Sequence, residues 1–318
     1  MKIDGIQSAD CLVIGDLNID LVLNGLRGLP ELDKEILAQN YSVVIGGSGG
    51  VFTAVLSRLG VVTSIISKIS NDFFGSFLIK ELKKNGADVS NLVIIDSGET
   101  GITINLSYEK GKSQISSVKL IKSFNKSDII FDKIENPRHI HFSSYYMMDG
   151  LKKDYLEIIK KLKQRNSKLT FSFDTNDDPT DTWGKEIYEI FRVIDILFLN
   201  RKEALKISRQ PSLDMALARL GSYVENVILK LGKEGYLAKC GSKTYRGYCK
   251  NLKNEYFQDS TGAGDNFDAG FIYGFLNGFG IVKSLSIANY VAEKSIEYMG
   301  GVGPEEKFNK IKKNFKIF

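Results

Sequence analysis

The stretch 259–271, DSTGAGDNFDAGF, is the strongest signal in this 318-residue chain and leads directly into an apolar helix predicted over 263–277. Gly262 and Gly264 allow the backbone to turn tightly and to expose successive N–H groups at the start of that helix. The positive end of the helix dipole favours an anion at the same place. The sequence therefore predicts a phosphate-binding turn, in which Asp265 is either a partner of the helix dipole or a general base beside the phosphate.

Around this turn, short apolar runs alternate with helical patterns along the chain. Continuous apolar runs are typical of strands buried on both faces, and strand-helix-strand order predicts a parallel sheet covered on both sides. We expect an α/β fold, a three-layer α-β-α sandwich with a mostly parallel sheet, in a single domain over 1–318. The predicted strands are 11–15, 63–69, 129–131, 139–142, 169–173, 194–199 and 227–231, and the predicted helices are 50–59, 73–85, 151–164, 213–223, 263–277 and 284–299.

Two segments, 20–45 and 100–119, break this alternation. The first contains no helical pattern, and the second places Thr103, Asn105 and Ser107 on one face of a strand and apolar residues on the other. A glycine-containing turn near the middle of the second segment suits a hairpin. We predict that the two segments form a small β-sheet that stands off the main domain as a lid.

Composition limits the partners and the compartment. The net charge of +5 comes largely from 305–318, which holds five lysines and two glutamates. We interpret this segment as a solvent-exposed basic helix and therefore expect no nucleic-acid partner. Cys11, Cys240 and Cys249 fit no metal or redox spacing and are expected to be reduced thiols. The N-terminus lacks an apolar signal segment, and no stretch reaches about 20 apolar residues. These features predict a cytoplasmic protein with no membrane partner.

A second glycine-rich turn lies in 43–60, VVIGGSGGVFTAVLSRLG, where a strand breaks into four glycines within five residues and continues as a helix. The backbone must approach something closely there, either a ligand or the neighbouring sheet. The segment does not match the dinucleotide pattern G-x-G-x-x-G, because Phe52 stands at the position of its third glycine.

Polar side chains follow two of the later predicted strands. Asn200 and Glu203 come just beyond 194–199, at the edge where ligands bind in open α/β sheets, although an Asn N-cap with a Glu at N3 has the same spacing. Residues 227–235, VILKLGKEG, end the next predicted strand in a glycine loop. Lys230 and Lys233 of this segment either offer charge to a phosphate or belong to a plain hairpin.

A third polar group follows the first predicted strand, in 15–20, GDLNID. Asp16, Asn18 and Asp20 lie on one side of this extended segment. Such a cluster can satisfy the hydroxyls of a sugar, because each buried hydroxyl needs a hydrogen-bond partner. Solvated carboxylates of a turn are the alternative.

These five segments, in this order and over most of the chain, resemble the ribokinase-like (PfkB) carbohydrate kinase family. Residues 259–271 resemble its C-terminal signature, 46–60 its N-terminal glycine signature and 200–203 its N-x-x-E motif. The resemblance implies transfer of the γ-phosphoryl group of ATP to an alcohol, with Mg²⁺ as the cofactor and K⁺ as a further expected cation. It also implies a homodimer that pairs through apolar residues on the outer face of the lid.

The resemblance further implies roles for individual residues. Asp265 would be the catalytic base, and the N–H groups of Gly262, Ala263 and Gly264 would form an anion hole. The residues implied to hold the sugar are Asn18, Asp20, Gly46, Gly47, Thr103 and Asn105. The residues implied around the nucleotide are Asn200, Glu203, Lys230, Gly232 and Asn289. Glu203 would hold Mg²⁺ through water, and Asp259 would take part in a monovalent-cation site.

Four positions bear on the choice of substrate. Val51 stands where the family usually has an Asn that contacts the sugar, and Ser48 stands where ribokinases carry a Lys, which disfavours ribose. If Asp177 and Asp178 approach the substrate, they repel phosphorylated or carboxylated sugars. We therefore expect a small neutral sugar. The alternatives are a nucleoside or vitamin-like alcohol kinase of the same fold, or a non-catalytic sugar-binding relative.

Overall fold

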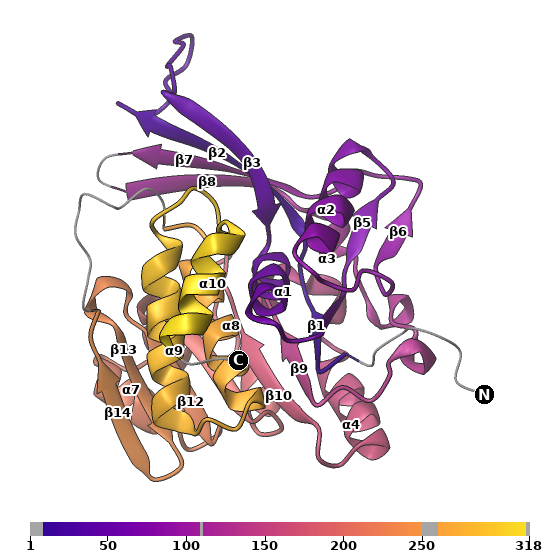
Figure 1. Cartoon of the computed structure of the whole chain (residues 1–318), viewed down its shortest axis with the longest axis vertical. Coiled ribbons are helices and arrows are strands. Elements are labelled where there is room, and N and C mark those ends of the chain that lie inside the picture. The colour runs from indigo at the N-terminus through magenta and orange to yellow at the C-terminus, as the bar shows by residue number, and fades with distance from the viewer. Residues whose placement is uncertain (1–8, 109–110, 250–259, 316–318) are drawn as a thin grey trace.

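Residues 9–108, 111–249 and 260–315 are described by a computed structural model, in which one large sheet lies between two layers of helices (Figure 1). The large sheet has eight strands in the order β14-β13-β12-β11-β10-β9-β1-β4. From β12 to β4 the neighbours are parallel, and β13 and β14 are antiparallel at one edge. The strands are β1 (Cys11–Ile14), β4 (Thr63–Ile66), β9 (His139–Phe142), β10 (Thr170–Asp174), β11 (Ile196–Asn200), β12 (Asn226–Lys230), β13 (Tyr236–Cys240) and β14 (Lys243–Gly247).

The large sheet contributes side chains to two hydrophobic cores, and β1, β4, β11, β12 and β13 contribute to both. Val13 and Phe198 belong to the core that also contains apolar residues of α1, α8 and α9, whereas Ile14 and Leu197 belong to the core with α4, α6 and α7. Because successive side chains of a strand point to opposite faces, both faces require apolar residues. This explains the continuous apolar runs and confirms the three-layer sandwich. The helices are α1 (Ser48–Leu59), α2 (Phe73–Lys84), α3 (Lys119–Lys122), α4 (Tyr155–Arg165), α5 (Ile187–Phe191), α6 (Arg201–Ser208), α7 (Leu213–Leu220), α8 (Ala263–Leu276), α9 (Ile281–Ser295) and α10 (Glu305–Asn314).

A separate four-stranded sheet projects from the main body, at the top of Figure 1. Its strands are β2 (Asn18–Leu26), β3 (Asn40–Gly46), β7 (Ile102–Tyr108) and β8 (Gly111–Ser117), in the order β3-β2-β7-β8. In the parallel pair β2 and β7, Asp20 lies opposite Thr103. The small sheet predicted from 20–45 and 100–119 is therefore present. That it opens and closes as a lid stays a prediction.

The face of the small sheet that carries Asp20 and Thr103 is polar, and the opposite face is apolar. Side chains on that opposite face include Ile115, which is 61% exposed, and Tyr41, which is 70% exposed. Because successive side chains of a β-strand point to opposite faces of the sheet, one segment supplies both the polar and the apolar face. Pairing of two copies through this apolar face stays a prediction.

Two strand predictions are wrong. Residues 129–131 lie at the junction of two 3₁₀ turns, Lys126–Asp128 and Phe131–Lys133, where Ile129 is buried and Ile130 is 55% exposed. The predicted strand 63–69 is divided: β4 ends at Ile66, and β5 (Lys68–Ser70) pairs with β6 (Val93–Ile95) in a two-stranded sheet. A short apolar run packs its side chains equally well in a turn or a strand, so periodicity could not separate these cases.

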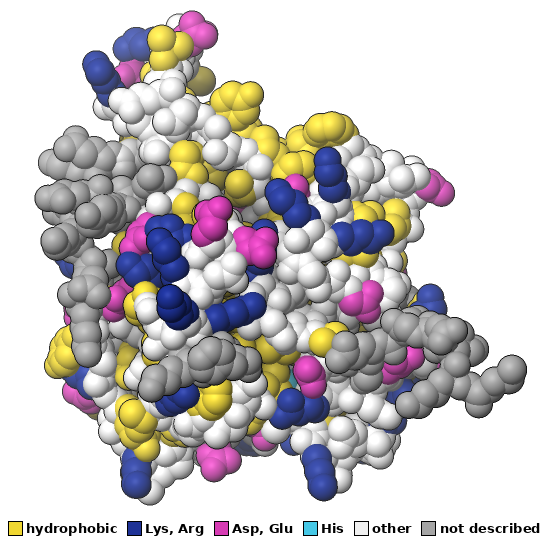
Figure 2. Space-filling view, viewed as in Figure 1, with side chains coloured by type: hydrophobic (Ala, Val, Ile, Leu, Met, Phe, Trp, Pro, Cys, Tyr) yellow, Lys and Arg dark blue, Asp and Glu magenta, His cyan; other side chains and the backbone are white. Residues whose placement is uncertain are grey.

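One lysine of the basic helix α10 has an acidic neighbour outside the helix. Lys307 Nζ lies 2.6 Å from Glu297 Oε2, whereas Glu305 of α10 itself pairs with Arg58 at 3.7 Å. On the face shown in Figure 2, Lys and Arg side chains stand among Asp and Glu. The charge of α10 is therefore partly balanced within the protein. Among the helices in the described ranges, none combines the length and the apolar character that crossing a bilayer requires.

Candidate active site

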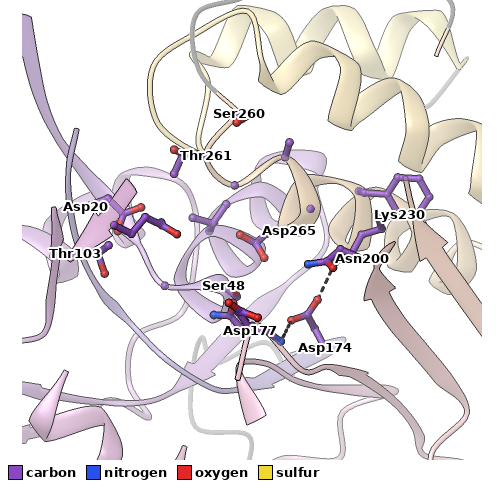
Figure 3. Close-up of a pocket in the computed structure, with 18 of the residues that line it drawn as sticks. Asp20, Ser48, Thr103, Asp174, Asp177, Asn200, Lys230, Ser260, Thr261 and Asp265 are labelled. Atoms are coloured by element: carbon purple, nitrogen blue, oxygen red, sulfur yellow. Dashed lines mark hydrogen bonds and ion pairs between the residues drawn. The ribbon is translucent and has the colours of Figure 1, made fainter. Parts of the chain in front are cut away.

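A cavity of about 1250 Å³ is bounded by the large sheet, the small sheet and the start of α8 (Figure 3). Its wall includes Asp174, Asn200 and Lys230, which are the last residues of β10, β11 and β12. Ligands of open α/β sheets bind at this carboxyl edge. The volume exceeds the roughly 300–1,000 Å³ of a pocket for one small ligand, so two substrates can be accommodated together.

Asp265 lies in the first turn of α8 and faces this cavity (Figure 3). Gly262 caps the helix with a left-handed φ of 73°. Burial raises the pKa of Asp265 to about 7, the Asp174 carboxylate adds to the rise and the Lys230 ammonium opposes it. A carboxylate with this pKa can accept a proton near neutral pH. Its position on the cavity wall favours a base over a role confined to the helix dipole.

The backbone at the start of α8 also lines the cavity, through Gly262, Ala263 and Gly264. One of the three predicted anion-hole amides already has a partner, because the Ala263 N–H donates to Ser260 O at 3.3 Å. This distance is longer than the usual range of about 2.7–3.2 Å for N–H···O bonds. An anionic oxygen would therefore compete well for that N–H group.

Asn18, Asp20 and Thr103 form a hydrogen-bonded cluster on the wall made by β2 and β7. Asn18 Nδ2 donates to Asp20 Oδ1 and to Thr103 Oγ1, each at 3.2 Å, and Thr103 Oγ1 lies 3.0 Å from Ser116 Oγ. All three residues are buried, so they are not solvated turn residues. Burial raises the pKa of Asp20 to about 7, although Lys112 acts to lower it. Donors and acceptors buried against a cavity suit a ligand with several hydroxyls.

Two of the predicted sugar residues, Gly46 and Asn105, lie behind the cavity wall rather than on it. A side-chain carbon at Gly46 would lie 2.2 Å from Asp20 Oδ1, so this glycine leaves space for the Asp20 carboxylate. Asn105 is fully buried and accepts a 2.7 Å hydrogen bond from Gln114 Nε2. Gly47 does line the cavity, with φ at 78°. Gly46 and Asn105 therefore support the wall that the other residues form.

Asp16 has a structural role that the sequence did not reveal. The N–H groups of Ser48 and Gly49 donate to its carboxylate at 3.2 and 3.0 Å, and Ser143 Oγ donates at 3.1 Å. The carboxylate thus satisfies amides at the start of α1. These contacts support close packing of the 43–60 turn on the neighbouring strand, while Gly47 and Ser48 of the same turn line the cavity, so the ligand interpretation stays a prediction.

Lys230 is buried in an ion-pair network. Its Nζ lies 2.8 Å from Asp174 Oδ2 and 2.7 Å from Asp268 Oδ2. Burial acts to lower the pKa of Lys230, but the two carboxylates outweigh this effect and raise it. The partners are 56 and 38 residues away along the chain, so no local pattern indicated the pairing. Lys230 keeps its charge beside the start of α8 while sharing it with two carboxylates.

Asn200 and Glu203 form a capping box at the start of α6 and also line the cavity. The Asn200 N–H donates to Glu203 Oε2 at 2.8 Å, and the Glu203 N–H donates to Asn200 Oδ1 at 3.0 Å. The structure is therefore compatible with both interpretations of this pair, the helix cap and the ligand-binding position. Burial raises the pKa of Glu203 to about 8, with the Asp174 charge adding to the rise.

The oxygen donors around Glu203 are of the type that Mg²⁺ prefers. Within the described ranges, no group of three or more His, Cys, Asp or Glu side chains could hold a metal ion directly. Mg²⁺ usually keeps several waters and binds through one or two carboxylates together with substrate phosphates. The residues present therefore fit a water-mediated Mg²⁺, as predicted for Glu203, rather than a fully protein-ligated ion.

Gly232 and Asn289 belong to another part of the cavity wall. Gly232 begins a 3₁₀ turn and has φ at 59°. Asn289 Nδ2 donates to Glu293 Oε1 at 2.6 Å and to Tyr248 O at 3.3 Å. The predicted cation ligand Asp259 lies outside the described residues, so its role stays a prediction.

Sequence reasoning missed three cavity residues on β8, namely Lys112, Gln114 and Ser116. They alternate along the strand, and Ser116 lies opposite Thr103. The alternating pattern in 100–119 indicated a strand with one polar face, but it could not show which strands would pair with each other. Pairing alone brings these side chains to the cavity.

Gly262 can be tested with a glycine-to-alanine substitution. A side-chain carbon at Gly262 would lie 2.6 Å from the Gly301 Cα, and the φ of 73° is itself costly for alanine. We expect Gly262→Ala to destabilise the fold by about 1–3 kcal/mol and to lower kcat at least tenfold. Gly278→Ala is the matched control, because its φ is 68° and no atom lies within 4 Å of the new carbon. If the two variants had the same melting temperature and the same kcat, the close-packing argument would be contradicted.

The comparisons with known proteins agree with this geometry. The profile of the pfkB family carbohydrate kinases matches residues 8–307. An uncharacterized sugar kinase from Archaeoglobus fulgidus is 30% identical over 250 residues, which make up 77% of this chain and 95% of that protein. The 2-dehydro-3-deoxygluconokinase of Bacillus subtilis is 25% identical over 92% of this chain and 90% of its own length.

Solved structures share the fold over nearly their full length. The adenosine kinase from Sinorhizobium meliloti superposes with a TM-score of 0.84 at 20% identity, covering 97% of this chain and 100% of that one. The Arabidopsis thaliana ribokinase complexed with ribose and ATP gives a TM-score of 0.78 at 18% identity, covering 96% of this chain and 99% of that one. Since the family match extends over residues 8–307, this chain belongs to the pfkB family and is a carbohydrate kinase.

Proposed function

We propose that this kinase transfers the γ-phosphoryl group of ATP to a hydroxyl of a small sugar, with Asp265 as the general base. The observation that carries the proposal is the placement of Asp265 in one cavity with the hydroxyl-binding cluster of Asn18, Asp20 and Thr103. ATP as the donor is supported by the ATP bound in the Arabidopsis ribokinase of the same fold.

In the proposed step, Asp265 accepts the proton of the reacting hydroxyl. A bond forms between that oxygen and the γ-phosphorus, the bond from the γ-phosphorus to the bridging oxygen of ADP breaks, and ADP carries away the electron pair. The amides of Gly262, Ala263 and Gly264 stabilise the negative charge that develops on the phosphoryl oxygens. Lys230 supplies positive charge close to the same turn, although Asp174 and Asp268 share it.

Around the nucleotide, we propose that Asn200 and Glu203 order water for Mg²⁺ and that Gly232 and Asn289 flank the base and ribose. When it is bound, Mg²⁺ neutralises charge on the β- and γ-phosphates. K⁺ would be an additional cation near Asp259. Closure of the small sheet would exclude water from the reacting atoms.

The neutral character expected for the sugar rested on Asp177 and Asp178. Both carboxylates have partners within the protein, although Asp177 lines the cavity. Asp178 is buried and accepts hydrogen bonds from the backbone N–H groups of Trp183 and Thr180, at 2.8 and 2.9 Å. Asp177 pairs with Lys202 at 2.7 Å. Neither contact supports strong repulsion of an anionic substrate, so other groups in the cavity must decide the charge of the sugar.

The proposal predicts a defined pH dependence. The base must be ionised to accept a proton, and the pKa of Asp265 is raised to about 7. We expect kcat/KM to be level above pH 8 and to fall tenfold per pH unit well below pH 7. A coupled assay of ADP release between pH 5.5 and 9 measures this profile. Because Asp20 also has a pKa of about 7, the same profile for Asp20→Asn separates the two carboxylates.

The substrate is identified by screening ADP release across sugars, polyols, nucleosides and vitamin-like alcohols. Turnover of sugars in preference to nucleosides supports the proposal. Exclusive turnover of a nucleoside would replace it with the nucleoside alternative. Sugar binding without any ATP turnover would favour the non-catalytic alternative.

A further inference from the structure

We propose that the sugar phosphorylated by this kinase carries one carboxylate, and that Lys112 on the small sheet binds it. This inference rests on the proposed function, because it assigns the substrate class of the same cavity. It concerns the part of the cavity wall formed by β8.

Lys112 is placed on the cavity wall by strand alternation. Ser116 lies opposite Thr103 and Gln114 lies opposite Asn105 in the antiparallel pair β7 and β8. Lys112 is the next residue on the same face, because side chains two apart share a face of the sheet. It lines the cavity together with Gln114 and Ser116. A cation therefore stands at the end of the row of polar side chains that begins at the hydroxyl-binding cluster.

Lys112 and Asp20 line the same cavity, and the charge of Lys112 acts on Asp20. Lys112 is the main charged group that lowers the pKa of Asp20, a residue of the hydroxyl-binding cluster. The two groups are thus close enough to interact although no ion pair forms between them. A ligand that contacts Asp20 with its hydroxyls lies within the field of this ammonium group.

Of the four other lysines on the cavity wall, three have carboxylate partners, and the fourth, Lys233, lies in the 3₁₀ turn that begins at Gly232, in the part of the wall proposed to hold the nucleotide. Lys122 lies 3.6 Å from Asp149, Lys202 lies 2.7 Å from Asp177, and Lys230 is held by Asp174 and Asp268. For Lys112, the described residues place no carboxylate within 4.0 Å. Lys112 therefore remains available to a ligand in the sugar part of the cavity.

The surrounding charges fix the orientation of such a substrate. Asp16, Asp20 and Asp265 lie on the wall where the hydroxyl is proposed to react, and they would repel an anion placed beside them. The carboxylate is therefore expected at Lys112, with the reacting hydroxyl at Asp265. One lysine matches one negative charge. A phosphate monoester carries about two charges near neutral pH and usually engages several donors, so a carboxylate fits this wall better.

The test compares matched acids and neutral sugars with the full-length enzyme. We would measure ATP-dependent phosphorylation of six-carbon aldonates and keto-aldonates, of the polyols and aldoses of the same stereochemistry, and of hexose phosphates. The best acid should exceed its neutral counterpart in kcat/KM by about 10- to 100-fold, and the ratio should fall as ionic strength rises. A preference for neutral sugars or for hexose phosphates would overturn the inference.

Variants of Lys112 connect this preference to the structure. Lys112→Met should reduce the acid-to-neutral ratio of kcat/KM at least tenfold, mainly through KM of the acid, and Lys112→Arg should retain most of it. Lys119→Met, which removes the same charge from a lysine outside the cavity wall, should leave the ratio unchanged. Equal ratios for wild type and Lys112→Met would refute the assignment. If no sugar of any charge is phosphorylated, the proposed function itself fails, and this outcome is distinct from phosphorylation without a preference for acids.

Discussion

Asp265→Asn is expected to lower kcat by about 10²- to 10⁴-fold, because asparagine cannot accept the proton of the reacting hydroxyl. The side chain keeps its size, so the cavity and the binding of ATP should be retained. Steady-state kinetics and ATP titration by calorimetry measure the two effects separately. Retention of more than a tenth of wild-type kcat would remove Asp265 from the role of base.

The same substitution is expected to stabilise the protein at alkaline pH. The folded pKa of about 7 lies above the ordinary value of 3.8, so folding is accompanied by proton uptake between these values. At pH 8 the ionised carboxylate therefore lowers stability, and asparagine removes a penalty of roughly 4 kcal/mol, at about 1.4 kcal/mol per pKa unit. Thermal melts should show the variant to be more stable at pH 8, with the difference lost below about pH 4.

Asp214→Asn is the matched control for both effects. Asp214 is also an acidic residue in the first turn of a helix, α7, but it lies outside the cavity. If Asp265 acted only through the helix dipole, the two substitutions would have similar small effects of about 0.3–1 kcal/mol on stability and none on kcat. We expect them to differ in kcat by at least a hundredfold.

Lys230→Met should have the largest effect on stability. It leaves Asp174 and Asp268, which are 7% and 1% exposed at their side chains, without their shared counter-ion. Breaking a buried ion pair from one side costs about 3–5 kcal/mol. Burial raises the pKa of Asp268, so this carboxyl can escape part of the cost by binding a proton, and the loss should be greatest at pH 8.5 and should shrink toward pH 5.5. Urea unfolding at the two pH values measures it.

Two further variants test the cause of this loss. Adding Asp268→Asn to Lys230→Met removes one of the unpaired carboxylates and should recover part of the stability at pH 8.5. Lys202→Met is the matched control, because Lys202 pairs with Asp177 on the same cavity wall but each side chain is 54% exposed. An exposed pair contributes roughly 0–1 kcal/mol. Equal losses for Lys202→Met and Lys230→Met would contradict the importance of burial.

Much of the fold could be predicted because its signals are local. The apolar run at β1, the glycine turn before α1 and the turn that ends at Asp265 are each readable within about 20 residues. The failures at 129–131 and 63–69 arose where an apolar run was too short for its periodicity to decide. The candidate site residues were found through turns and strand ends, which also mark the ligand-binding edge of such a sheet.

The local sequence determined that this chain has a parallel sheet covered by helices, and that Asp265 begins a helix after a glycine turn. Only the tertiary structure decided that Lys230 is held by Asp174 and Asp268, that Gly46 leaves space for Asp20, and that Lys112 faces the cavity. The physical reason is the range of the interactions. Backbone conformation and strand alternation depend on neighbours in sequence, whereas ion pairs and cavity walls depend on strand pairing and packing between distant segments.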